Sequence, residues 1–362
     1  MKQVLLSIAL VTVVCTAASA KIWRLNNNNG GAISPTIKTD FLQGVTLQQA
    51  HDSAKVLSGD TIHIEQSNTT YGNCTFTKRL TVIGVGNFLG MNPNTQVQTS
   101  FNSLVGAITI TSPSAAGTQI LGLQATYIIA GANNVKVAYC YFGYVEIGSG
   151  SAANTDNIQI SDNYCNNGNT YYCISSSAGT GLNTNVGIYG NILLTSTSYQ
   201  TINLNSNSSG IVKNNILYGY YTCFGALYNF YVVNNMSYNT GGAGYANNFY
   251  NCVIEYNMAP YASSYQTPGG TGNTTNATNN TLQTVANMLF AGGASTDGQW
   301  KLQPGSPAKN AGKSGVDLGA FAGDFPYSLS GIVNIPNIYQ LNIATIPAGA
   351  STMSVTLSAK SN

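Results

Sequence analysis

The chain has 362 residues, of which only 7% are charged, and its formal net charge is +2. So few charges leave neither a basic stripe for nucleic acid nor an acidic tail, and we expect neither class of partner. Solubility must depend on Asn, Ser, Thr, Tyr and Gly side chains, and the length allows one long domain with a large core.

The first twenty residues have the pattern of a secretory signal peptide. Lys2 gives a basic start, residues 4–14 form an apolar run, and residues 18–20 (Ala-Ser-Ala) offer a cleavage site. Cys15 leaves a lipoprotein open as an alternative, although the residue before it is bulkier than that processing site usually has. No later segment has the roughly 18 uninterrupted apolar residues of a membrane-spanning helix. We expect cleavage after Ala20 and a secreted protein, extracellular or on the surface of a bacterium, without a transmembrane segment.

A flexible extension, residues 21–44, is expected to precede a short amphipathic helix at residues 46–55. Thr46 and Gln49 have the spacing of a capping box. The predicted apolar face contains Leu47, Ala50 and Ala54. That face could close the open end of a repetitive fold, which a terminal repeat cannot cover by itself.

Residues 59–65 then alternate strictly between polar and apolar, which predicts a first strand with Ile62 and Ile64 pointing inward. Beyond it one pattern occurs six times: apolar residues two apart, then a polar pair, then Asn in most copies. The copies are residues 134–140, 157–163, 185–191, 209–215, 229–235 and 251–257. Their last positions are separated by 23, 28, 24, 20 and 22 residues. Repeats of this length with a period of two inside each unit predict the stacked coils of a parallel β-solenoid.

The Asn that ends each unit predicts a ladder, because a buried amide can bind the same amide in the next coil. The predicted ladder contains Asn163, Asn191, Asn215, Asn235 and Asn257. Two columns should face the core. They are Val135, Ile158, Val186, Gly210, Phe230 and Cys252, and Val137, Ile160, Ile188, Val212, Val232 and Ile254.

Six of the seven cysteines follow the predicted cleavage site. The register places Cys252 and Cys165 in inward columns and Cys140 at a ladder position, so buried thiols are favoured and a disulfide between neighbouring coils stays open. No Cys-x-x-Cys or Cys/His spacing points to a metal, and we expect no cofactor.

Three segments complete the chain. Residues 261–284 are expected to leave the coils as a polar loop. Residues 300–323 are rich in turn residues and are expected to close the last coil. Residues 338–343 and 353–357 predict an appended β-hairpin.

In these motifs the chain resembles the secreted right-handed parallel β-helix proteins of the pectin-lyase-like superfamily, particularly those of Bacteroidetes-type bacteria. The resemblance rests on the capping helix before residues 59–62, the Asn-marked coils, and residues 302–308 and 317–321. It implies an all-β, single-stranded right-handed parallel β-helix. The expected organisation is a signal peptide at 1–20, an extension at 21–44, the β-helix at 45–325 and a C-terminal β extension at 326–362. Members include lyases, hydrolases, esterases and adhesins, so the fold does not choose a function.

Catalysis on such a fold needs paired carboxylates, or a base beside an acid, on neighbouring coils. Asp156, Asp162 and Lys136 lie on neighbouring coils and are the candidates, while Glu146 lies on another wall. The acids are scattered rather than paired, so a calcium site is not expected. His63 beside Glu65 could act as a base, although a lone histidine is more often incidental.

Tyrosine, Asn and Ser favour binding, because rings stack on sugars while amides and hydroxyls bind their hydroxyl groups. The candidate glycan-binding residues are Tyr218, Tyr220, Tyr221, Tyr228, Tyr231, Tyr245 and Tyr250. Tyr is also a good strand former, so a structural role is the alternative. We expect a structural or adhesive module with polysaccharide, a cell-surface glycan or its own copies as partners. The alternatives are a polysaccharide lyase or glycoside hydrolase, and a filament subunit.

Overall fold

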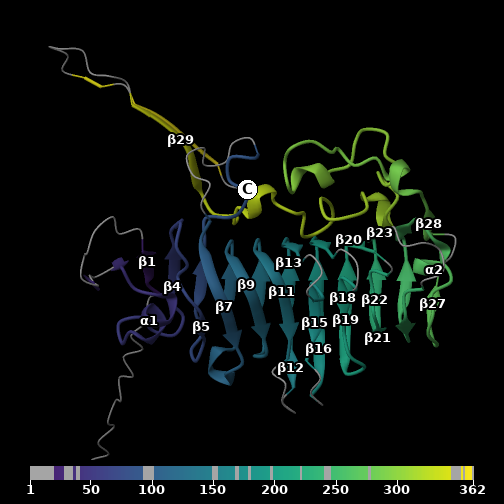
Figure 1. The fold of residues 1–362 in the computed structure, drawn as a ribbon, viewed down its shortest axis with the longest axis horizontal. Helices are drawn as coiled ribbons and strands as arrows, with labels where there is room; N and C mark the ends of the chain where they lie inside the picture. Colours follow the sequence, from purple (N-terminus) through teal and green to yellow (C-terminus); the bar gives the residue numbers. More distant parts are fainter. Residues whose placement is uncertain are drawn as a thin grey trace, which may run out of the picture.

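Alternating apolar residues build two long sheets in which successive coils stack, as the computed structural model shows (Figure 1). It describes residues 20–27, 36–37, 41–92, 102–148, 154–167, 171–177, 181–195, 199–220, 222–239, 246–275, 279–343, 352–353 and 355–360. The predicted signal peptide lies outside these residues, apart from Ala20. The fold is a parallel β-helix, as the repeats predicted.

The first sheet, sheet A, has 14 strands, which are parallel except for the pair β2–β3. Its order is β2 (Thr36–Ile37), β3 (Phe41–Gln43), β1 (Ile22–Asn26), β4 (Thr61–Ile64), β6 (Thr81–Ile83), β8 (Gln119–Leu121), β10 (Lys136–Ala138), β13 (Gln159–Ser161), β16 (Asn183–Tyr189), β19 (Ser208–Lys213), β22 (Phe230–Val233), β25 (Val253–Glu255) and β27 (Thr274–Thr275), with β12 (Thr155–Asp156) beside β16.

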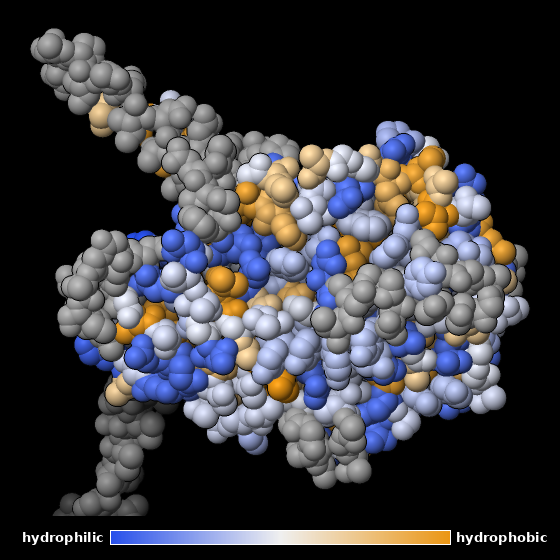
Figure 2. Space-filling model, viewed as in Figure 1, coloured by the Kyte–Doolittle hydropathy of each residue, from blue (hydrophilic) through white to orange (hydrophobic). Residues whose placement is uncertain are grey.

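The second sheet, sheet B, has 12 strands. Its order is β28 (Thr281–Leu282), β26 (Met258–Ala259), β23 (Met236–Asn239), β20 (Ile216–Gly219), β17 (Ile192–Leu194), β14 (Tyr164–Asn166), β11 (Tyr141–Ile147), β9 (Gln124–Ala130), β7 (Leu104–Ile110) and β5 (Cys74–Thr75), with β15 (Ile174–Ser176) joining β11 to β18 (Ile202–Asn203). A small pair, β21 (Leu227–Tyr228) and β24 (Phe249–Tyr250), completes the later coils. Figure 2 shows hydrophilic residues interspersed with apolar ones over this face of the molecule.

The predicted asparagine ladder is confirmed, and it has one more rung than the repeats indicated. Each side-chain Nδ2 donates to Oδ1 of the next Asn at 2.9 to 3.1 Å, from Asn163 through Asn257 to Asn280. At the other end, the Cys140 amide donates to Oδ1 of Asn163 at 2.9 Å, so Cys140 does occupy a ladder position. The rungs are at most 1% exposed, and each chain of amides satisfies polar groups that a buried corner would otherwise leave unpaired.

The expectation of a loop excursion at 261–284 is therefore wrong in part. Within that segment, β27 and β28 add a further coil, Asn280 continues the ladder and the short helix α2 (Ala262–Tyr265) buries Tyr265. The apolar pattern did not predict this coil, because its strands have two residues each and contain Thr rather than Val or Ile.

A left-handed residue precedes each ladder position from Cys140 to Asn257 and turns the chain from sheet A into sheet B. These residues are Tyr139, Asp162, Gly190, Asn214, Asn234 and Tyr256, with φ between +55° and +60°. Asn and Asp tolerate this region better than most residues, which explains part of the polar pair in the repeat. Both predicted inward columns are buried, apart from the partly buried Gly210.

The N-terminal helix α1 (Leu47–Asp52) has the predicted capping box between Thr46 and Gln49. Leu47 and Ala50 are fully buried, whereas Ala54 lies beyond the helix and is exposed, and Val56 takes the buried place instead. Residues ahead of the helix also belong to the core, because β1 pairs with β4 and buries Trp23 and Leu25.

Residues 306–336, here named the C-terminal strap, do not close the last coil as expected. Figure 1 shows this segment running back above the strand ends toward β4. Along the strap, the contacts include Lys313 with Asn234, Phe325 with Tyr189, Ser330 with Asn87 and Val333 with Leu121, so it runs from later coils to early ones. The strap is anchored by the fully buried Asp297, which accepts hydrogen bonds from the Ser330 amide at 2.6 Å and from Asn92 Nδ2 at 2.8 Å.

A second apolar core lies between the strap and sheet B, outside the β-helix. Sheet B contributes the residue after each ladder Asn: Tyr164, Ile192, Ile216, Met236 and Met258. The strap contributes Ala308, Leu318, Ala320 and Tyr327. The strap thus covers a column that would otherwise be an exposed apolar patch.

The predicted hairpin is present as the antiparallel pair β29 (Asn337–Ile343) and β30 (Val355–Lys360), which extends away from the coils in Figure 1. All six described cysteines are free and buried, and Cys165 aligns with Phe142 and Leu193 as the register predicted.

Candidate functional site

The three predicted catalytic candidates do not converge. Asp156 ends β12 before the corner at Asn157, whereas Asp162 forms the next corner, so the two carboxylates lie at opposite ends of β13. Lys136 begins β10, on the adjacent coil, and pairs with Gln159, three residues before the Asp162 corner. No carboxylate pair forms here, as the scattered acids in the sequence indicated.

The two acids have opposite environments. Asp156 accepts hydrogen bonds from Thr184 Oγ1 and Asn185 Nδ2, both at 2.7 Å, and these donors lower the pKa of its carboxyl. Asp162 is 2% exposed, and burial raises the pKa of its carboxyl to about 7, against smaller opposing effects of Ser161 and Lys136. Its Oδ1 atom accepts no hydrogen bond from the described residues. Asp162 is a buried corner residue under the strap and offers no surface to a substrate.

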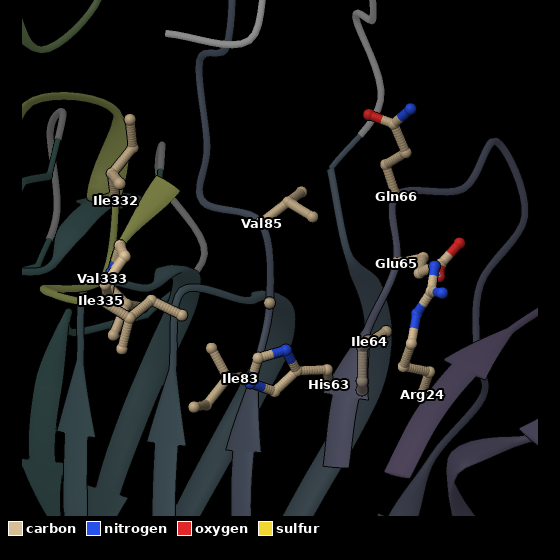
Figure 3. A pocket seen from close by; sticks show the side chains of 12 residues that line it. Arg24, His63, Ile64, Glu65, Gln66, Ile83, Val85, Ile332, Val333 and Ile335 are labelled. Atoms are coloured by element: carbon tan, nitrogen blue, oxygen red, sulfur yellow. The ribbon is translucent and has the colours of Figure 1, made fainter. Parts of the chain in front are cut away.

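His63 lines a pocket of about 380 Å³ between the first coils and the end of the strap. Figure 3 shows His63 between the Arg24 and Glu65 side chains and the apolar wall of Ile332, Val333 and Ile335. Glu65 is held by an ion pair with Arg24 and by Asn26 Nδ2 at 2.6 Å. Burial and the nearby Arg24 lower the pKa of His63, so the imidazole is neutral at pH 7. The carboxylate beside it is committed to Arg24, which does not favour a His–carboxylate base.

The predicted binding tyrosines are dispersed over several surfaces. Tyr228 and Tyr250 stack on each other with ring centroids 4.6 Å apart, and Tyr218 packs on Tyr238 beside the second core. Tyr220 is 36% exposed. Tyr231 interacts with Glu255 and Lys313 at the strap. Tyr221 and Tyr245 lie outside the described residues. The structure therefore does not assemble the predicted set into one site.

A different set of tyrosines does assemble, on the outer face of sheet B. This tyrosine cluster comprises Tyr127, Tyr144, Tyr171, Tyr172 and Tyr199. Tyr127 and Tyr144 stack with centroids 4.9 Å apart, because β9 and β11 pair them directly across the sheet. The other three come from the segments before β15 and β18. Tyr171 meets Tyr144 at a centroid distance of 4.9 Å, and Tyr171, Tyr172 and Tyr199 meet one another at 5.2 to 6.2 Å.

Each tyrosine of the cluster is half-buried, so part of its surface remains in contact with solvent. Glu146 lies two residues from Tyr144 on the same outer face of β11, next to Ile129 and Ser175 in the register. Burial raises the pKa of the Glu146 carboxyl, and Glu146 adds to the causes that raise the pKa of the Tyr144 hydroxyl. The cluster thus combines aromatic surface, hydroxyl donors and one carboxylate.

The sequence contained a signal for this cluster that went unused. Tyr127 and Tyr144 both occupy outward positions of adjacent strands, but the repeat alignment covered only the Asn-marked units and not this part of sheet B. The loop tyrosines Tyr171, Tyr172 and Tyr199 carry no periodic signal, because they lie between strands.

A second pocket, of about 300 Å³, lies between sheet A and the strap. Lys213 Nζ pairs with Asp324 Oδ2 at 2.7 Å on one side. On the other side Lys313 Nζ binds Glu255 Oε1 at 2.5 Å and the Tyr231 hydroxyl at 2.7 Å. Only tertiary structure joins these groups, since the strap residues lie 58 to 111 positions from their partners.

Within the described ranges, no group of three or more His, Cys, Asp or Glu side chains could hold a metal ion. The helices described here are too short or too polar to cross a membrane. Comparison with protein families, curated proteins and solved structures found no match. Function must therefore be argued from the chemistry of these surfaces alone.

Proposed function

We propose that this chain is an exported β-helix that acts outside the cell or at its surface as a structural or adhesive module and binds polysaccharide through the tyrosine cluster. Export is proposed from the N-terminal sequence pattern. The likeness to the pectin-lyase-like superfamily, proposed from the motifs, agrees with an extracellular glycan as partner.

The observation that supports binding is the convergence of five half-buried tyrosines on one face of sheet B. Neighbouring rings and the strands beneath restrict these side chains, so little rotamer freedom remains to be lost on binding. Aromatic faces stack on the apolar faces of sugar rings, and phenol hydroxyls exchange hydrogen bonds with sugar hydroxyls. A face built from several coils also suits a polymer better than a small molecule.

The test is retention of the mature chain on a panel of insoluble and gel-immobilised polysaccharides. We expect Tyr144→Ala and Tyr199→Ala each to weaken retention about five-fold, in line with about 1 kcal/mol per aromatic contact. Tyr250→Ala is the matched control, because Tyr250 also belongs to a two-ring stack but lies on β24. Binding that is absent across the panel, or equal in all three variants, would contradict the proposal.

A polysaccharide lyase or glycoside hydrolase is the second candidate function, and Glu146 is the observation that favours it. A carboxyl whose pKa is raised by burial suits a general acid, and this one lies beside the tyrosine cluster. The assay measures new reducing ends and unsaturated products across the same panel. Turnover that is abolished in Glu146→Gln would establish catalysis, whereas retention without products in either protein would leave binding as the function.

A further inference from the structure

The pocket between sheet A and the strap has the composition of a ligand site. Its floor includes Val233, which is 1% exposed, together with Val316 from the strap. Lys213, Tyr231, Lys313 and Asp324 supply polar groups around this apolar floor. A volume of about 300 Å³ is at the lower end of small-molecule sites and suits roughly one or two sugar units.

The charges in and behind the pocket balance one another, and of the two carboxylates only Asp324 lines the pocket itself. The Lys213 ammonium meets Asp324, and the Lys313 ammonium meets Glu255, which lies behind Tyr231. Glu255 is 17% exposed, and the hydrogen bond from Lys313 is the largest cause that lowers the pKa of its carboxyl, so this ion pair is present at neutral pH. Two cations and two carboxylates leave no net charge for an anion to neutralise.

Such a pocket fits a polyhydroxylated, uncharged ligand. Ammonium groups donate hydrogen bonds to sugar hydroxyls and carboxylates accept from them, and charge-assisted hydrogen bonds of this kind are stronger than neutral ones. The valines suit the apolar face of a sugar ring. A uronate, sulfate or phosphate would place a further negative charge next to Asp324 and Glu255, and repulsion from these carboxylates would oppose its binding.

We propose that this pocket is a second saccharide site, separate from the tyrosine cluster, and that it selects uncharged sugars, so that the glycan is a neutral polysaccharide rather than a uronate or sulfated one. The inference rests on the proposed glycan-binding function. It assigns roles to Lys213, Lys313, Asp324 and Glu255 in setting the charge of the ligand.

The experiment is calorimetric titration of the full mature chain with neutral hexasaccharides from glucan, xylan and mannan, and with hexagalacturonate. We expect at least one neutral hexasaccharide to bind about ten-fold more tightly than hexagalacturonate. Asp324→Asn leaves the pocket with one net positive charge, and we expect it to raise hexagalacturonate affinity about ten-fold. Asp324 is 73% exposed, so its substitution is compatible with folding, which thermal melting verifies.

Val316→Phe, which fills the pocket, should remove one of the two hexasaccharide sites and with it the preference for neutral sugars. Tyr144→Ala should weaken the site at the tyrosine cluster and leave the pocket site and its preference in place. Polysaccharide retention that depends on Tyr144, with no effect of Val316→Phe on any ligand, would overturn the pocket while leaving the proposed function intact. No binding of any glycan by the wild-type chain would overturn both. Wild-type preference for hexagalacturonate would overturn the selection of uncharged sugars.

Discussion

The buried carboxyl of Asp162 should make stability fall as pH rises, and Asp162→Asn should remove that dependence. Burial raises the pKa of this carboxyl from its ordinary value of 3.8 to about 7 in the folded chain. Between pH 4 and 7 the unfolded chain has therefore released a proton that the folded chain retains. The stability of the folded state is undiminished below about pH 4, falls through this window and stays low above pH 7.

The rise of the Asp162 pKa from 3.8 to about 7 costs the folded state about 4 kcal/mol at a pH where this carboxyl is ionised in both the folded and the unfolded chain. Asp162 is 2% exposed, so solvent screens little of this cost. Asn has nearly the same shape and does not ionise. We therefore expect Asp162→Asn to be more stable than wild type by up to about 4 kcal/mol at pH 8 and to differ little at pH 4.

The assay is thermal unfolding followed by circular dichroism at pH 4, 5.5, 7 and 8 for both proteins. Asp156→Asn is the control, because Asp156 is only partly buried and hydrogen bonds lower the pKa of its carboxyl, so its loss should slightly reduce stability at neutral pH. Melting curves of Asp162→Asn and wild type that shift in parallel across the whole pH range would refute the reasoning.

Three further predictions concern the ladder, the strap and the thiols. Asn215→Ala removes two accepted and three donated side-chain hydrogen bonds inside a corner, so we expect the free energy of unfolding to fall by about 3–5 kcal/mol. Chemical unfolding measures this loss, and a loss below about 1 kcal/mol would contradict the role of the ladder. Gly190→Ala places a Cβ 2.2 Å from the Phe325 carbonyl oxygen, so the strap should be displaced and cleaved faster in limited proteolysis, while unchanged cleavage would show that the contact yields easily. Burial raises the pKa of the Cys140 and Cys223 thiols to about 12, and all six described cysteines are buried. We therefore expect no reaction with a thiol reagent at pH 8 in the native chain and six reactive thiols after unfolding. Fewer than six reactive thiols would indicate a disulfide.

Much of the fold could be predicted because each coil repeats the same local pattern of residues and interactions. Apolar residues two apart define strands, a left-handed polar residue turns the chain, and Asn satisfies the buried corner. The coil at β27 and β28 was missed because its strands contain Thr and have two residues each. The ladder position of Asn280 could nevertheless have been predicted, since Asn280 follows Asn257 by 23 positions, within the spacing of the earlier rungs.

The strap could also have been suspected. Outward apolar residues recur after the ladder Asn, among them Ile192, Ile216, Met236 and Met258, and such a column must be covered. The repeat alignment sorted the strand positions before each Asn and left the position after it unexamined. The strap sequence itself, rich in turn residues, does not show which coils it crosses.

By itself the sequence determined the β-helix, the capping helix, the ladder and the inward cysteines, because these depend on residues within one coil or on an equal spacing between coils. Only the tertiary structure decided the functional surfaces. Loops bring Tyr171 to Tyr144 and Tyr199 to Tyr171, and the returning strap brings Lys313 to Glu255 and Asp324 to Lys213. Such contacts join residues that share no period in the sequence, and their positions are fixed by how the loops and the strap pack on the coils.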